Sequence, residues 1–261
     1  MHLGPRILLL LPLAALLSCG SSQNPSAPLT FSGNWEAVGG PIALTSDPIM
    51  YFTGSLQFNG STVTGTLRAF TNPKIGSSPC VAATQDLQAT GTLDADNNLT
   101  LTFPIAGGAA TITAALGPDL QSSAAGTWQI VGGSCATASA AITIAQYLPL
   151  TGTYVGYLAN GLANGSATAI LTQSTTPNAN GLFPLTGTII VSGTCSGTMP
   201  MVAELVSGNN INTAGTSTPT PSAELTGTFD PTATTIQASV ELFAPNCSIQ
   251  NIALQSTLTR Q

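Results

Sequence analysis

Charged side chains are scarce in this sequence of 261 residues, where they make up 5% of the total, against about 25% in an average soluble domain. Thr, Ser, Gly, Ala and Asn take their place. Long surface helices need Glu, Lys, Arg and Gln on their outer faces, whereas Thr and other β-branched residues suit the pleated surface of a sheet. The composition therefore predicts an all-β protein.

Histidine and positive charge are almost missing as well. The one histidine is His2, and the four cations are Arg6, Arg68, Lys74 and Arg260, against ten acidic residues. Scattered cations form no basic patch, which excludes binding to the phosphate backbone of a nucleic acid. If His2 is removed with an N-terminal signal, no imidazole is left for Ser-His-Asp or Cys-His catalysis, for metal ligation or for a pH switch.

The first 18 residues have the pattern of an export signal. A short basic start ending at Arg6 precedes an apolar run over residues 7–17. A helix of that length, at about 1.5 Å per residue, is too short for the roughly 30 Å hydrocarbon core of a bilayer. A basic start, a short apolar segment and a boundary of small residues therefore predict a secretory signal.

The end of this signal, Leu16-Leu17-Ser18-Cys19, resembles the lipobox of bacterial lipoproteins. The resemblance implies that residues 1–18 are cut off and that Cys19 carries acyl chains, each buried CH₂ contributing about 0.8 kcal/mol of membrane binding. Residues 19–29, rich in Gly, Ser and Pro, then form a flexible tether. Gly20, which is not acidic, favours the outer membrane of the cell envelope. The alternative is ordinary secretion with Cys19 as a discarded or free thiol.

Two halves of the remaining chain, 30–146 and 147–261, resemble each other. Each opens with an apolar residue, a hydroxyl, Gly, a short polar residue and an aromatic, as FSGNW and LTGTY. Each has two cysteines, 55 residues apart in the first half and 52 in the second, and a Gly-Thr-aromatic segment before the second cysteine. Landmarks in the same order at similar distances predict two duplicated domains.

Within each half, apolar and polar residues alternate with a period of two, as over residues 62–69, 99–103, 236–242 and 252–258. This alternation is typical of antiparallel strands with one face in water. Turn-forming clusters recur roughly every 8–15 residues and predict about seven or eight strands per half, in a small meander barrel or a sandwich. Repeated Thr-Gly-Thr segments place Gly inside strands, where it permits the tight coiling of a small barrel.

The Gly33-Asn34-Trp35 opening resembles the first strand of lipocalin and avidin-type barrels, in which the Trp closes the barrel floor. The second half has Tyr154 at this place. The resemblance covers a few residues and supports a meander barrel. In its composition and repeats the chain also resembles uncharacterised, duplicated, Thr/Gly-rich lipoproteins of bacterial envelopes. This resemblance implies no known activity.

Four cysteines remain when Cys19 is set aside, and they allow three pairings. Export favours disulfides, and the duplication selects Cys80–Cys135 and Cys195–Cys247, one bridge per half. Each would stabilise its domain by about 4 kcal/mol in the loop-entropy description. No C-x-x-C motif and no histidine accompany these cysteines, which opposes a redox or metal-binding role.

Two groups of residues are candidates for chemistry. The segment 94–98, DADNN, spaces oxygen ligands as a calcium loop does, but 207–211 in the second half, SGNNI, has no carboxylate, so we expect a hairpin turn in both places and no metal. Paired carboxylates could hydrolyse glycosides without histidine, yet none lies in a motif and we expect all of them on the solvated surface. The carboxylates considered are Glu36, Asp47, Asp86, Glu204, Glu224 and Glu241.

Aromatic residues near the repeated Gly segments are expected in the core or at a barrel floor. They are Trp35, Trp128, Tyr154, Tyr157 and Phe229. The sequence as a whole predicts a noncatalytic, lipid-anchored envelope protein without a cofactor, a binding or interaction module whose small-molecule, glycan or protein ligand it does not identify. The alternatives are a lipocalin-like carrier of a small apolar molecule, which needs an open cavity inside a barrel, and, more distantly, a carboxylate-based glycoside hydrolase.

Overall fold

The computed structural model describes ten ranges of the chain. They are residues 32–40, 50–71, 85–105, 108–117, 123–133, 139–159, 164–193, 195–214, 221–244 and 253–261. Every helix or strand element in these ranges is a β-strand, which confirms the all-β prediction. The predicted signal, the tether with Cys19, and the residues Asp47, Lys74, Cys80, Cys135 and Cys247 lie outside the described residues.

The first sheet is a closed barrel of eight strands. Its strands are β1 (Gly33–Gly39), β2 (Met50–Asn59), β3 (Thr62–Thr71), β4 (Gln85–Leu93), β5 (Asn98–Ile105), β6 (Gly108–Ala115), β7 (Ala124–Val131) and β8 (Ala140–Tyr147). Each strand pairs antiparallel with the next, and β8 returns to pair with β1, for example through Trp35 opposite Gln146. The predicted meander barrel is thus confirmed for this part of the chain, in preference to a sandwich.

The second sheet has nine strands. They are β9 (Gly152–Ala159), β10 (Asn164–Gln173), β11 (Phe183–Val191), β12 (Gly197–Pro200), β13 (Glu204–Ser207), β14 (Asn210–Thr213), β15 (Ser222–Phe229), β16 (Thr235–Phe243) and β17 (Ala253–Arg260). Two short strands pair with different parts of β11: β12 pairs with Thr188–Val191, and β13 pairs with Phe183–Leu185. Because β10 also pairs with β11 and β17 pairs with β9, the pairings run in a circuit around this sheet.

Period-two alternation explains which side chains fill the two cores. In β5, Leu99, Leu101 and Phe103 are fully buried, and the residues between them face outward. In β16, Ile236, Ala238, Val240 and Leu242 are buried in the same manner. The two sheets have separate apolar cores, since no residue belongs to both clusters.

Glycines within strands allow close approach between neighbouring strands. A Cβ atom on Gly65 in β3 would lie 2.1 Å from the carbonyl oxygen of Ser55, and one on Gly227 in β15 would lie 2.1 Å from that of Gln237. No side chain fits at such distances. Both glycines belong to Thr-Gly-Thr segments, and the coiling expected from these segments therefore has a direct steric basis.

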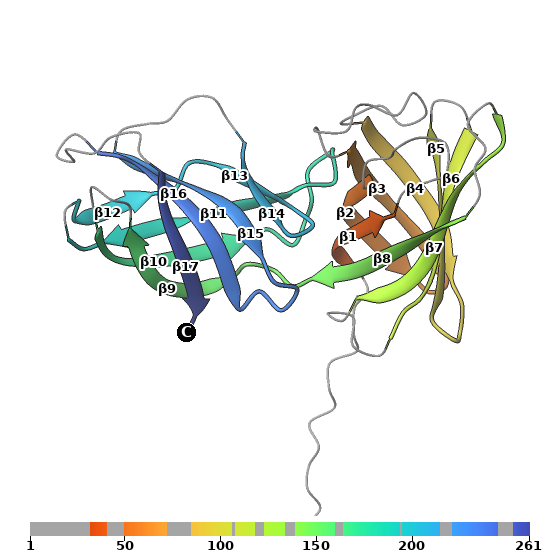
Figure 1. Cartoon of the computed structure of the whole chain (residues 1–261), viewed down its shortest axis with the longest axis horizontal. Helices are drawn as coiled ribbons and strands as arrows, with labels where there is room; N and C mark the ends of the chain where they lie inside the picture. Colours follow the sequence, from red (N-terminus) through yellow and green to blue (C-terminus); the bar gives the residue numbers. More distant parts are fainter. Residues whose placement is uncertain are drawn as a thin grey trace, which may run out of the picture.

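Figure 1 shows the barrel and the second sheet side by side, with β8 leading from one toward the other. The short connection from Tyr147 to Gly152 stays close to the second sheet, where the backbone N–H of Leu148 donates to the carbonyl of Pro231 at 2.9 Å. The ring of Tyr147 packs edge-on against Phe229 with the ring centres 5.5 Å apart. The last strand of the barrel therefore ends against the core of the second sheet.

Candidate functional site

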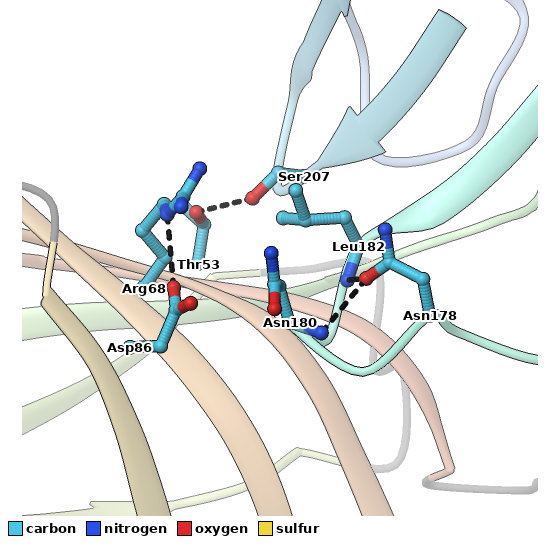
Figure 2. A network of polar contacts seen from close by, with 7 residues as sticks. All are labelled: Thr53, Arg68, Asp86, Asn178, Asn180, Leu182 and Ser207. Carbon is cyan, nitrogen blue, oxygen red and sulfur yellow. Dashed lines mark hydrogen bonds and ion pairs between the residues drawn. The ribbon is translucent and has the colours of Figure 1, made fainter. Parts of the chain in front are cut away.

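The tip of the β13–β14 hairpin docks on the barrel. The side chain of Asn34 in β1 binds the backbone of Gly208 twice: its Nδ2 donates to the carbonyl oxygen at 2.7 Å, and its Oδ1 accepts from the N–H at 2.8 Å. The hydroxyls of Thr53 in β2 and Ser207 are hydrogen-bonded as well (Figure 2). All three side chains that make these bonds are buried. We call Asn34, Glu36, Thr53, Ser207 and Gly208 the inter-sheet joint.

Glycine is the residue type that fits at position 208, in the centre of this joint. Its φ is +57°, in the left-handed region, and a Cβ atom would lie 2.5 Å from Oε2 of Glu36 and 2.8 Å from the methyl group of Thr53. Both the backbone conformation and the space therefore require glycine. The segment SGNN, interpreted from the sequence as a hairpin turn, is such a turn and also the contact with the barrel.

Glu36 lies buried under this hairpin, with 6% of its surface exposed. Burial raises the pKa of its carboxyl, and this is opposed by hydrogen bonds from the N–H of Asn209 and the hydroxyl of Tyr147, at 3.4 and 3.3 Å. Burial, with the charge of Glu36 beside it, raises the pKa of Tyr147 in turn. The expectation of a solvated Glu36 is wrong, because the second sheet covers it.

A second contact comes from the loop between β10 and β11. Asn178 shapes this loop by accepting, at 3.0 Å each, the backbone N–H groups of Asn180 and Leu182 (Figure 2). Gly181 lies so close to β3 that a Cβ atom on it would be 2.2 Å from the carbonyl oxygen of Thr66. The loop and the hairpin thus approach neighbouring strands of the same barrel wall.

Between these two contacts lies a pocket of about 340 Å³. Its lining combines residues of both sheets: Arg68, Leu182, Leu205, Ser207, Asn210, Asn212 and Thr213. Arg68, from β3, is anchored by its Nε, which forms an ion pair of 2.9 Å with Asp86 of β4, and both side chains are about one-third exposed (Figure 2). The sequence did not single out any of these lining residues as a site, because the pocket exists only where the two sheets meet.

The interior of the barrel is occupied by its own aromatic side chains. Phe52 on β2 contacts Phe103 on β5 with the ring centres 5.0 Å apart, and it contacts Trp128 on β7 at 5.6 Å. Since β2, β5 and β7 are not neighbours in the barrel, these contacts cross its lumen. At this level, therefore, the lumen is occupied by aromatic rings of the barrel itself.

The aromatic residues expected in the core are buried with one exception. Trp35 is 1% exposed in the barrel, and Tyr154 is fully buried, with its hydroxyl donating to the carbonyl of Ala233 at 2.8 Å. Trp128 and Phe229 are buried also. Tyr157 differs: it lies on the outer face of β9 and is 58% exposed.

Glu204 is the most deeply buried carboxylate among the described residues, at 1% exposure, and its expected place on the surface is wrong. Glu204 and Val206 are two residues apart in the sequence, and both side chains lie on the inner face of β13. Its Oε1 accepts the N–H of Leu225 at 3.1 Å, and its Oε2 has no hydrogen-bond partner among the described residues. Burial, with the charge of nearby Glu224, raises the pKa of Glu204 to about 8, against the effect of the Leu225 bond.

The DADNN segment forms the turn between β4 and β5, as expected. Asp94 accepts the backbone N–H groups of Asp96 and Asn98 at 2.9 and 2.8 Å, and the side-chain amide of Asn98 at 2.8 Å. The amide and backbone of Asn98 lower the pKa of Asp94. Asn97 has a φ of +62°, a conformation that Asn tolerates. The oxygens of Asp94 are thus used to shape the turn.

Of the predicted disulfide cysteines, the described residues include Cys195, which is 5% exposed and disulfide-bonded. The pairing stays a prediction because the other three cysteines lie outside the described residues. Within the described part of the chain, no three His, Cys, Asp or Glu side chains gather as a metal site would require.

The fold and site define an all-β protein in which an eight-stranded barrel and a second sheet share a polar joint and a pocket. No helix in the described ranges has the length and apolar character needed to cross a bilayer. No family model, no curated protein and no solved structure matches the chain.

Proposed function

We propose that this protein is a noncatalytic, lipid-anchored protein of the bacterial cell envelope, and that the pocket between its two sheets binds a small polar molecule. The observation that carries the binding role is the pocket itself, formed jointly by β3, β13, β14 and the loop before β11. Ligand pockets are frequent at domain interfaces and have volumes of about 300–1,000 Å³. The volume here is near the lower end of that range and suits a molecule the size of a sugar or an amino acid.

The lining determines the ligand's chemistry. Asn210 and Asn212 each offer a donor and an acceptor, Ser207 and Thr213 offer hydroxyls, and Leu182 and Leu205 form the apolar part. Asp86 engages Nε of Arg68, and the terminal guanidinium nitrogens provide further donors at the pocket. A ligand with several hydroxyl, amide or carboxylate groups matches this set.

The arrangement of carboxylates supports a noncatalytic role. Glu204 lies on the inner face of its sheet and Glu36 lies beneath the hairpin, so both are withdrawn from solvent. Asp86 is engaged by Arg68. Glycoside hydrolysis needs two carboxylates that face each other across a substrate at about 5–9 Å, and buried carboxylates cannot contact one. The aromatic rings that meet across the barrel lumen likewise oppose a carrier of apolar molecules.

Ligand-observed NMR with a panel of monosaccharides, disaccharides and amino acids tests the pocket. We expect saturable binding of at least one compound, and loss of that binding in Asn212→Trp, whose indole fills the pocket. Thr102→Trp, on the outer face of β5, is the matched control and keeps binding. Binding that survives Asn212→Trp would place the ligand elsewhere, and saturable uptake of cis-parinaric acid would favour the apolar carrier.

Metabolic labelling with a clickable fatty acid tests the anchor. The expected result is label on the wild-type protein, found with the outer membrane after fractionation, and none on Cys19→Ala. Label that persists in Cys19→Ala would refute lipid attachment at this residue.

The predicted duplication belongs to this proposal, and strand order supports it. When β12 is set aside, the second sheet has eight strands in meander order, as the barrel has, and Trp35 and Tyr154 lie on their first strands. One landmark does not correspond: Trp128 is on the seventh strand of the barrel, whereas Phe229 is on β15, the sixth strand of that circuit. Non-reducing peptide mapping should find one disulfide within each half, and a bridge between halves would contradict the duplication.

A further inference from the structure

A shallow groove of about 330 Å³ lies on the outer face of the second sheet, away from the joint. It is lined by Tyr157, Gln237, Ala238, Gln255, Ser256 and Thr257. Tyr157 has the highest exposure of the large apolar side chains in the described residues, at 58%. An aromatic ring in this position keeps one face available for a ligand.

The groove follows the seam where β17 meets β9. Gln255 pairs with Ala159 and Thr259 pairs with Val155, but the residues between them form no ladder pairs. Gly156, without a side chain, lies opposite this interruption, and a Cβ atom on it would be 2.4 Å from the carbonyl oxygen of Thr257. The local interruption of the ladder explains why a depression exists on an otherwise regular sheet.

The groove offers hydrogen-bonding groups without charge. Thr257 donates to Oε1 of Gln237 at 2.9 Å, and Nε2 of Gln255 donates to Ser239 at 3.1 Å. The amide N–H groups of Gln237 and the carbonyl oxygen of Gln255 are not used by these bonds. Ser256 shares the inward face of β17 with Leu254 and Leu258 and is buried, so its hydroxyl is not among the groups that the groove presents.

We propose that this groove binds a neutral polysaccharide chain. Sugar hydroxyls donate and accept hydrogen bonds, as the amides and hydroxyls here do, and the C–H face of a pyranose ring packs on an aromatic ring such as Tyr157. A charged polymer finds no counter-charge, since the lining contains no Asp, Glu, Lys, Arg or His. The open, shallow shape suits a chain that passes along the surface better than a small molecule, which needs enclosure.

Affinity electrophoresis of the full-length protein in gels containing laminarin, dextran or hydroxyethyl cellulose tests this site. We expect at least one of these neutral polymers to retard the protein, and Tyr157→Ala to weaken that binding at least tenfold. Tyr157→Phe, which keeps the ring, retains most of the binding. The matched control is Ile170→Ala, on the outer face of neighbouring β10, where Ile170 is 46% exposed; its mobility stays that of the wild type.

Four results would overturn the proposal: no retardation by any of the three polymers, equal retardation by anionic alginate, unchanged binding in Tyr157→Ala, or equal weakening in Ile170→Ala. Thermal unfolding of each variant shows whether the substitution at an exposed position leaves the fold intact. Asn212→Trp, which fills the pocket between the sheets, leaves retardation unchanged, so this site and the pocket are tested separately.

Discussion

Replacing Glu204 by Gln should remove most of the pH dependence of stability between about pH 5 and 8. The pKa of Glu204 is raised from 4.5 to about 8 in the folded protein. The folded state therefore holds a proton that the unfolded state releases, so stability is fully present below about pH 4.5 and is lost as the pH rises toward 8. One proton changes the free energy of unfolding by about 1.4 kcal/mol per pH unit, which limits the loss from this residue to about 5 kcal/mol.

The amide in Glu204→Gln cannot ionise, yet its oxygen can still accept the N–H of Leu225. We expect the variant to gain stability relative to the wild type as the pH rises, by up to about 4 kcal/mol between pH 5 and 8. Urea unfolding of the full-length protein at four pH values in this range measures the effect. Glu36→Gln is a useful comparison, because burial also raises the pKa of Glu36 and its contribution has the same sign.

Histidine also titrates in this pH range, and the one histidine of the chain is His2, in the predicted signal; a His2→Asn control separates its contribution from that of Glu204. If wild type and Glu204→Gln lose stability with the same slope between pH 5 and 8, Glu204 is not protonated in the folded protein and the reasoning fails.

Three further substitutions test the joint and the first-barrel turn. Gly208→Ala should uncouple the barrel from the second sheet, because the new methyl group meets Oε2 of Glu36 at 2.5 Å; calorimetry should show two separated transitions where the wild type has one, and an unchanged trace would contradict the steric argument. Asn34→Ala should cost about 2–4 kcal/mol, since it leaves the buried N–H and carbonyl of Gly208 unpaired, and a urea midpoint equal to that of the wild type would show that water replaces these bonds. Asp94→Ala should lower the urea midpoint at neutral pH and have less effect in acid, because the lowered pKa of Asp94 gives stability that is lost as the pH falls through its folded pKa; a destabilisation that is equal at pH 2 and pH 7 would exclude the carboxylate as its source.

The strands of the barrel were accessible to sequence analysis because their determinants are local, whereas the choice between a barrel and a sandwich was left open, since closure depends on the distant pairing of β1 with β8. Alternation over residues 99–103 correctly placed Leu99, Leu101 and Phe103 inside, and all three are fully buried. The turn at Asp94 was equally local, since its hydrogen bonds reach four residues along the chain at most. Such features depend on neighbours that any short window of sequence contains.

The candidate site could not be predicted from local sequence patterns. Glu36 lies at an ordinary strand position, and what buries it is the hairpin around Gly208, far away in the chain. The pocket has the same origin, because Arg68 and Asn212 approach each other only when the two sheets dock. For Glu204 a local signal existed, because it lies two residues before Val206 on the inner face of β13. It was nevertheless expected on the solvated surface, because none of the carboxylates lies in a motif.

The inter-sheet joint is polar, and hydrogen bonds fix how the two sheets are oriented relative to each other. Their contact at the hairpin is made by Asn34, Thr53 and Ser207, through side-chain amides and hydroxyls rather than by a broad apolar face. Hydrogen bonds of this kind have strict geometry and contribute about 1 kcal/mol each, so they favour one relative orientation more than they add stability. Apolar packing comes instead from Tyr147, which ends the barrel and contacts Phe229 of the second sheet. A fixed orientation is what the shared pocket requires, because its lining is complete only when both sheets are in place.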